Sequence, residues 1–330
     1  MSVIEVHKLR KTYRRHQKEE GLLGSLKSLF KRRFEETRAV DEVSFRLEEG
    51  ELVGFLGPNG AGKTTTLKML SGILHPSGGE ARVLGYTPWQ RANAFRRQFA
   101  LVMGNKSQLW FDIPAMDSLR LNKEIYGVSE ADFRDVVGEL SGLLNVEKLL
   151  EVPVRNLSLG ERMKMELMAS LLHRPRVLLL DEPTIGLDVV SQKAIREFLA
   201  RYNRERRTTV LLTSHYMADI QALCRRVLLI NRGRLEFDGS LEALASRFRR
   251  FKRVRASFES PVPASDLEAL GRVVEMEGNR ALLEVPESAA TDAARQLLTR
   301  FPVSDLGIEE TPIEDLIRDA FETKAGPAGT

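Results

Sequence analysis

The chain has 330 residues, 42% of them hydrophobic and 29% charged, with a formal net charge of +4. These proportions are typical of a globular protein, and the length predicts one large domain and a smaller one. No apolar run approaches the ~20 residues that cross a bilayer, and the N-terminus lacks the apolar core of a secretory signal. The only cysteine, Cys224, excludes a disulfide framework and a thiolate zinc cluster. We therefore expect a cytosolic chain with Cys224 in its core.

Short apolar stretches alternate with helical patterns from residue 1 to about 240. Near-continuous apolar strands predict an α/β fold whose sheet is covered on both faces. Residues 105–160 carry few strand signals and several helical stretches, which predicts a helical subdomain. The predicted strands are residues 3–6, 43–47, 52–56, 100–103, 177–180, 210–212 and 227–230.

A basic segment, residues 15–37, lies near the start of the chain. Five of its apolar side chains fall on one face of a helix, with basic side chains beside them. Such a helix contacts a membrane surface or a permease, or it packs on its own domain, and the sequence leaves both interpretations open. The apolar residues are Leu22, Leu23, Leu26, Leu29 and Phe30.

Residues 57–65 carry the phosphate-binding pattern G-x-x-x-x-G-K-[ST] between a predicted strand and a predicted helix, residues 64–73. Small residues let the backbone wrap around phosphates, and the helix N-terminus adds positive potential. We expect Lys63 to reach the outer phosphates and Thr64 to hold Mg²⁺. The pattern predicts that the chain binds a nucleoside triphosphate. The loop residues are Gly57, Pro58, Asn59, Gly60, Ala61, Gly62, Lys63, Thr64 and Thr65.

Two acids, Asp181 and Glu182, follow the apolar residues 177–180. They stand at the C-terminal end of a predicted buried strand, where open α/β sheets bind ligands. Asp181 is placed to hold Mg²⁺ through its water shell, and Glu182 to polarise an attacking water. A strand that merely ends in two capping acids is the alternative, and the phosphate loop disfavours it.

Further short motifs accompany the loop and the acids. Ser158 and Glu161 have the capping-box spacing at the start of an amphipathic helix that runs to about Leu172. Asp188 ends a G-L-D triplet after the acidic strand, and His215 ends another predicted strand. Tyr13, far upstream, suits stacking on an adenine ring.

This ordered set of motifs resembles the ATP-binding subunits of ABC transporters over residues 1 to about 240. The resemblance implies a P-loop cassette with a RecA-like α/β core, an antiparallel β subdomain and a helical subdomain, using ATP and Mg²⁺. The resemblance assigns residues 57–65 to the Walker A loop, residues 177–182 to Walker B with its catalytic glutamate, and residues 157–161 to the signature. Asp188 then belongs to the D-loop.

The same resemblance assigns roles to two single side chains and to a dimer. His215 would be the switch histidine that contacts the γ-phosphate, and Tyr13 would be the A-loop aromatic. The family works as a dimer in which Ser158 and Gly160 of one chain complete the site built on Lys63 of the other.

Two departures from the family pattern concern the site. The usual signature is LSGGQ, whereas Leu159 and Glu161 stand here at its third and fifth positions. Counting along the pattern puts Asn105 where a Q-loop glutamine is usual, and Gln108 follows three residues later. Asparagine reaches less far toward Mg²⁺ and water, so both residues stay candidates, with Asn105 as the positional match.

The basic insert and the runs GNKSQLWFD and DEPTIGLDVV look like one subgroup of ABC-2-type exporter ATPases. In that subgroup the ATPase is a separate chain that binds membrane-spanning permease subunits at the cytoplasmic face of the cell membrane. We expect permease contacts around residues 105–130, where Trp110, Phe111 and Pro114 form either an exposed apolar surface or part of the subdomain core.

The alternative is an ABC ATPase without transport, with a regulatory role or one linked to nucleic acid. The spacing between the Walker motifs is too short for the coiled arms of chromosome-organising members. A single cassette contrasts with ribosome-acting members, and one cysteine contrasts with zinc-bearing repair members. Basic runs such as residues 247–255 keep nucleic-acid binding as the weaker hypothesis. Glu182 and His215 argue against a regulatory binder that does not hydrolyse ATP.

From about residue 241 the pattern changes to that of a small α+β domain, residues 241–330. The residues Gly278 and Asn279 predict a hairpin turn. We find no catalytic constellation here, and of two roles, dimer support and ligand sensing, we favour dimer support. The expected elements are helix 241–248, strands 254–258, 273–276 and 281–285, helix 289–300, strand 303–308 and helix 313–321.

Overall fold

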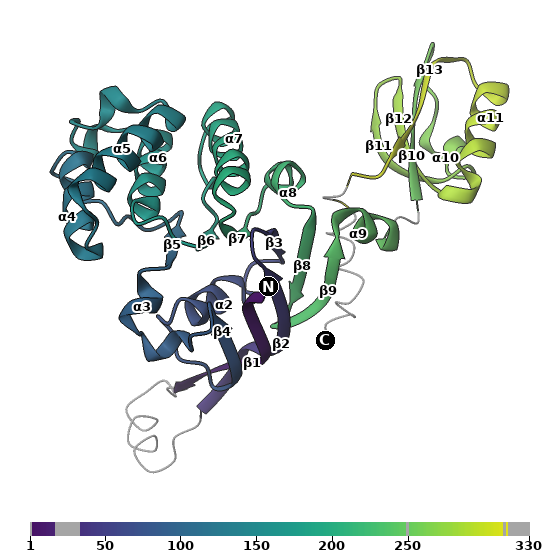
Figure 1. The fold of residues 1–330 in the computed structure, drawn as a ribbon. Coiled ribbons are helices and arrows are strands. Elements are labelled where there is room, and N and C mark those ends of the chain that lie inside the picture. The colour runs from purple at the N-terminus through teal and green to yellow at the C-terminus, as the bar shows by residue number, and fades with distance from the viewer. Residues whose placement is uncertain (1, 17–33, 249–250, 313–314, 316–330) are drawn as a thin grey trace, which may run out of the picture. The chain divides into compact units, whose positions relative to one another are not determined.

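The computed structural model describes residues 2–16, 34–248, 251–312 and 315. The chain divides into two compact units, Met1–Leu241 and Glu242–Thr330 (Figure 1). In these described ranges, no helix is both long enough and apolar enough to span a bilayer.

The first unit is built on a six-stranded sheet in the order β5-β6-β7-β3-β8-β9. All neighbours are parallel except β9, which is antiparallel to β8. Every residue of β6 and β7 is buried, which confirms a sheet covered on both faces. The strands are β3 (Leu52–Leu56), β5 (Phe99–Met103), β6 (Val177–Asp181), β7 (Thr209–Thr213), β8 (Arg226–Asn231) and β9 (Arg234–Ser240).

A second, antiparallel sheet has the order β2-β1-β4, with β1 at Ser2–His16, β2 at Phe34–Glu48 and β4 at Gly78–Val83. Its first two strands are longer than their apolar cores predict because the hairpin continues outward in polar residues. Arg14 and Glu36 form an ion pair at 2.8 Å across these arms. Residues 15–16 and 34–37 of the basic segment are therefore strand, and its leucine face falls within 17–33, outside the described residues.

Helices cover the central sheet, and α4, α5 and α6 gather beside α7 (Figure 1). Ser129 caps α5: its hydroxyl oxygen accepts a hydrogen bond from the Asp132 amide, as is typical of a serine at the N-cap. One apolar core joins both sheets and includes Phe45 and Phe55. The helices are α2 (Lys63–Leu70), α3 (Asn93–Arg96), α4 (Ala115–Tyr126), α5 (Glu130–Leu144), α6 (Leu159–Leu171), α7 (Val189–Arg206) and α8 (Met217–Leu223), with 3-10 turns η1 (Pro88–Gln90), η2 (Glu147–Leu149) and η3 (Val154–Asn156).

The second unit has its own core around Leu283 and Leu297. After α9, its elements follow a split β-α-β-β-α-β order, and the antiparallel sheet reads β11-β12-β10-β13. Gly278, at φ +55°, turns β11 into β12 and confirms the predicted hairpin. The predicted helix 313–321 lies outside the described residues, except for residue 315. The elements are α9 (Leu241–Phe248), β10 (Phe251–Phe258), α10 (Ala264–Leu267), β11 (Arg272–Glu277), β12 (Arg280–Pro286), η4 (Glu287–Ala289), α11 (Ala290–Arg300) and β13 (Val303–Glu310).

Candidate nucleotide site

The phosphate loop joins β3 to α2 at the carboxyl edge of the central sheet. A Cβ on Gly57 would lie 2.2 Å from the Ile230 carbonyl oxygen, and one on Gly62 would lie 2.4 Å from that of Ala39. Glycine is therefore required at both positions. Gly62 also precedes α2 at φ +110° without a side-chain cap, so the first amide groups of the helix are left for a ligand.

Lys63 is 5% exposed, and its ammonium lies over its own loop. Nζ donates to the carbonyl oxygens of Gly57 at 2.6 Å and Pro58 at 3.2 Å. Burial lowers the pKa of Lys63, and the nearby charges of Glu182 and Asp181 oppose that effect. Among the residues that the structure describes, the hydrogen bonds of this buried ammonium go to carbonyl oxygens, which phosphate oxygens can replace.

The two predicted acids lie at the end of β6. Asp181 is 8% exposed and accepts a hydrogen bond from Thr213 Oγ1 on the neighbouring strand β7 at 2.8 Å. The Glu182 amide donates to the same Oγ1 at 3.0 Å and to the Thr213 carbonyl oxygen at 3.1 Å. Glu182 has φ +55°, a left-handed conformation that is unusual for a residue other than glycine. Thr213 therefore fixes the turn from which Glu182 projects.

His215 contacts Glu182 directly. Its Nε2 lies 2.7 Å from Glu182 Oε1, and both side chains are partly exposed. His215 follows β7, and Glu182 follows β6. The sequence singled out both residues, and the structure brings them together as a carboxylate–imidazole pair at the edge that also holds Lys63.

The two Q-loop candidates lie in different surroundings. The Gly104 amide donates to the Asp181 carbonyl oxygen at 2.8 Å, so Asn105, which is exposed, directly follows a residue bound to the acidic strand end. Gln108 instead donates from Nε2 to Ser170 Oγ on α6 at 2.7 Å. The structure thus brings Asn105 to the site edge and places the Gln108 side chain on the signature helix.

Glu166 is a buried acid that sequence reasoning missed. It is 3% exposed on α6 and accepts hydrogen bonds from the amides of Gln108 at 3.0 Å and Leu109 at 3.4 Å, and from the Ser107 hydroxyl. Burial raises the pKa of its carboxyl group. Its only sequence signal was a charge among the apolar positions of the helix.

The signature residues begin α6 as predicted. Ser158 is the N-cap, and Ser158 and Glu161 form a full capping box: the Ser158 amide donates to Glu161 Oε2 at 2.8 Å, and the Glu161 amide to Ser158 Oγ at 3.3 Å. These bonds lower the pKa of Glu161. Glutamate at the position of the usual glutamine therefore completes the capping box, a role that either side chain can fill.

The signature loop lies against the D-loop of the same chain. A Cβ on Gly160 would lie 2.3 Å from Ser191 Oγ and 2.8 Å from Ser191 Cβ, so a larger residue there would displace Ser191. Asp188 caps α7 by accepting hydrogen bonds from the Ser191 amide at 2.9 Å and its hydroxyl at 2.7 Å, which lower the pKa of Asp188. In the part of the chain that the structure describes, no hydrogen bond or ion pair joins Ser158 or Gly160 to Lys63.

Tyr13 lies on β1 opposite Thr37 and is 43% exposed. Thr37 is two residues before Ala39, whose carbonyl oxygen borders Gly62. The Lys11 ammonium lies 5.5 Å from the ring centroid of Tyr13. The ring is therefore exposed near the phosphate loop, as stacking on a base requires.

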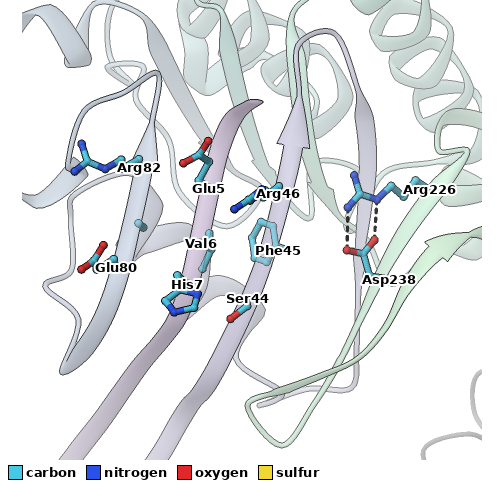
Figure 2. A pocket seen from close by; sticks show the side chains of 11 residues that line it. Glu5, Val6, His7, Ser44, Phe45, Arg46, Glu80, Arg82, Arg226 and Asp238 are labelled. Atoms are coloured by element: carbon cyan, nitrogen blue, oxygen red, sulfur yellow. Dashed lines mark hydrogen bonds and ion pairs between the residues drawn. The ribbon is translucent and has the colours of Figure 1, made fainter. Parts of the chain in front are cut away.

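A cavity of about 490 Å³ lies elsewhere, on the polar face of the antiparallel sheet (Figure 2). Glu5 stands between Arg82 and Arg46 across the three strands, and Arg226 pairs with Asp238 at 2.7 Å. Its acidic and basic side chains balance, and no residue of the phosphate loop lines it. Cavity volume therefore does not identify the nucleotide site.

Comparison with known proteins agrees with this geometry. The profile of the family described as ABC transporter matches residues 40–185, and that of the EvrA-like ABC transporter C-terminal domain matches residues 250–309. The ABC transporter ATP-binding protein NatA of Bacillus subtilis is 35% identical over 217 residues, which cover 64% of this chain and 88% of NatA.

Two further likenesses extend this result. Nod factor export ATP-binding protein I of Burkholderia thailandensis is 36% identical, with 64% of this chain and 69% of the relative covered. A solved ATP-binding cassette, dimeric in a post-hydrolysis state with ADP and Pi, has a TM-score of 0.58 at 22% identity and covers 72% of this chain and 98% of the cassette. At that identity the structure supports the fold, and it confirms the expected P-loop cassette. With its Walker loop, acidic strand end and signature helix, the chain belongs to the ATP-binding proteins of ABC transporters, which are ATP-hydrolysing enzymes.

Proposed function

We propose that this chain powers export through a separate ABC-2-type permease, working as a head-to-tail dimer at the cytoplasmic face of the membrane. One observation carries the dimer: Lys63, Glu182 and His215 gather at one edge, while Ser158 and Gly160 lie against the D-loop without a bond to Lys63. A second copy, turned head to tail, supplies its Ser158 and Gly160 to complete the nucleotide site built on Lys63. The exporting relative supports the direction of transport.

The residues divide the work of hydrolysis between them. Lys63 would exchange its two loop carbonyls for phosphate oxygens. The Thr64 hydroxyl, the Asp181 carboxylate acting through the water shell of the ion, and Asn105 would hold Mg²⁺, whose preferred ligands are oxygens and which would neutralise phosphate charge. Glu182 accepts the proton of the attacking water, and its contact with His215 orients the carboxylate.

Exposed apolar side chains around the signature and the D-loop also support a dimer. Leu159 and Ile185 are each 39% exposed, Val189 is 76% exposed and Val190 is 78% exposed. Apolar side chains clustered at a functional surface are typical of an interface that a partner covers. A second copy of the chain is the partner that also completes the site.

Mixing two inactive variants tests this arrangement. Lys63→Ala destroys one half of each site, and Ser158→Arg destroys the other half. A mixed dimer contains one fully intact site, so we expect ATP hydrolysis to return on mixing. Ser129→Arg removes an equivalent helix cap on α5 and controls for the lost cap. No recovery, with wild-type activity in the Ser129→Arg control, would place the complete site within one chain.

A second surface suits the permease. Trp110 is 61% exposed and Phe111 45% exposed, with the Arg162 guanidinium 5.0 Å from the Phe111 ring, and Ile125 on α4 is 62% exposed. We assign permease contact to these side chains. Trp110→Glu should reduce co-purification with membranes that carry the permease, whereas Ile73→Glu, at another exposed apolar position, should not. Equal retention of both variants would contradict the assignment.

A further inference from the structure

A buried carboxylate lies behind the Glu182–His215 pair. Asp219, on α8, is 1% exposed. Its Oδ2 accepts hydrogen bonds from Thr184 Oγ1 at 2.5 Å and from Ser214 Oγ at 2.7 Å. One oxygen atom of a single side chain therefore joins two segments that are far apart in the sequence.

Those two segments carry the catalytic pair. Thr184 comes two residues after Glu182, and Ser214 comes directly before His215. The turn after Glu182 closes through a hydrogen bond from the Ile185 amide to the Glu182 carbonyl oxygen at 3.2 Å. On the other side, the Tyr216 amide donates to Ser214 Oγ at 3.0 Å, so the same hydroxyl shapes the backbone on both sides of His215.

The second oxygen of Asp219 is neutralised from α7. Arg196 Nη1 donates to Asp219 Oδ1 at 2.8 Å, and the Arg196 side chain is 16% exposed. A buried carboxylate is tolerated when it is paired and fully hydrogen-bonded, and a network satisfied in this way is rigid. Because α7 begins at the D-loop cap Asp188, the network also ties the D-loop helix to the two catalytic segments.

We propose that Asp219 is a positioning residue for ATP hydrolysis. Its carboxylate holds the turn after Glu182 and the strand end before His215 at a fixed separation, so the 2.7 Å contact between carboxylate and imidazole is set before nucleotide binds. The inference rests on the roles proposed above for Glu182 and His215.

The sharpest perturbation spares the buried ion pair. Thr184→Val removes one hydroxyl donor at nearly constant shape and leaves the Asp219–Arg196 pair in place. Thr208→Val is the matched control, because Thr208 is also 2% exposed and lies just before β7 begins, at the other end of that strand from Ser214. Its hydroxyl donates to the Pro175 carbonyl oxygen at 3.4 Å and interacts with the side chain of Tyr202, and neither partner belongs to the Asp219 network. Both variants lose one buried threonine hydroxyl, so a general packing effect appears in both.

The first readout needs no nucleotide. The chain has five histidines, so the His215 imidazole signal is assigned in a heteronuclear NMR spectrum by comparison with His215→Gln. We expect Thr184→Val to move the His215 signal in the ligand-free protein and Thr208→Val to leave it in place. An unmoved signal in Thr184→Val would overturn the proposal, whatever happens to turnover.

The second readout is steady-state hydrolysis. We expect Thr184→Val to lower kcat about tenfold while KM for ATP stays within about twofold, because loosening the pair misplaces the base without touching the phosphate loop. Unchanged kcat would also overturn the positioning role. If the His215 signal moves but wild type itself does not hydrolyse ATP, the coupling stands and the proposed function fails.

Discussion

Replacing Gly104 by alanine tests how closely the loop after β5 lies against the acidic strand end. An added Cβ would lie 2.1 Å from the Glu182 carbonyl oxygen and 2.9 Å from Ile185 Cγ2. The Glu182 carbonyl oxygen is a backbone atom, so no side-chain rotation can move it away from the added Cβ. The two segments must separate by about 1 Å, and forced overpacking of this kind costs about 1–3 kcal/mol. Because Glu182 belongs to the displaced turn, hydrolysis should fall as well.

Gly138→Ala provides a control with the opposite expected sign. Gly138 lies in α5, and a Cβ there meets no atom within 4 Å. Replacing a helical glycine by alanine in open space stabilises by about 0.5–1 kcal/mol. We therefore expect the urea midpoint of the first unit to fall for Gly104→Ala and to rise for Gly138→Ala, with ATP hydrolysis reduced only in Gly104→Ala.

The reasoning is refuted if Gly104→Ala neither lowers the urea midpoint nor slows ATP hydrolysis. A Gly104→Ala protein with the wild-type urea midpoint and wild-type turnover would mean that the loop yields freely and does not position the acidic turn. A protein that is destabilised yet fully active when folded would limit the role of Gly104 to packing.

Three further predictions concern single side chains. Glu161→Ala removes half of the capping box and should cost about 1 kcal/mol in urea unfolding at pH 7, whereas Glu161→Gln retains an acceptor for the Ser158 amide. Because the pKa of Glu161 is lowered, this cost should be present above about pH 4.5 and disappear as the pH falls through the folded-state pKa. Burial raises the pKa of Glu166, so the contribution of this side chain to the free energy of unfolding is present below about pH 4.5. That contribution is lost as the pH rises through the pKa of Glu166 in the folded chain. Wild type should therefore lose stability relative to Glu166→Gln over that range. Burial raises the pKa of the Cys224 thiol, so a thiol-reactive dye should label the native chain slowly at pH 7 and the unfolded chain fast.

Each of these three has a clear contrary result. Equal urea midpoints for Glu161→Ala and Glu161→Gln would show that the capping box does not stabilise α6. If the difference in the free energy of unfolding between wild type and Glu166→Gln did not change with pH, Glu166 would have the same pKa in the folded and unfolded chain. Rapid native labelling of Cys224 would contradict its burial.

Local patterns predicted the secondary structure around the candidate nucleotide site well. The phosphate loop, the acids Asp181 and Glu182, and the Ser158–Glu161 capping box depend on residues within a few positions of one another. Their geometry follows from strand, turn and helix start, and the structure shows the same strand, turn and capping box. In the second unit, the hairpin and the helices α9 and α11 were predicted in the same way from turn and amphipathic signals, whereas the short helix α10 was not predicted.

Features that depend on distant partners were not predictable. β4 and β9 are both edge strands whose residues are mostly exposed or half-buried, so neither carries the apolar run by which a strand is predicted. Asp219 and Glu166 are acids on helices, and their partners come from other segments of the chain. Gln108 binds Ser170, 62 positions away, which the motif spacing could not reveal. The roles of the basic insert and of the second unit stay predictions.

The most direct test of the composite dimer is the rate of ATP hydrolysis by the purified chain as a function of its concentration, with Glu182→Gln measured in parallel. If two copies complete each site, the rate should rise more than linearly with concentration. The Glu182→Gln chain should bind ATP without turning it over, because the water then lacks its proton acceptor. A rate strictly proportional to concentration, or wild-type turnover in Glu182→Gln, would contradict the account.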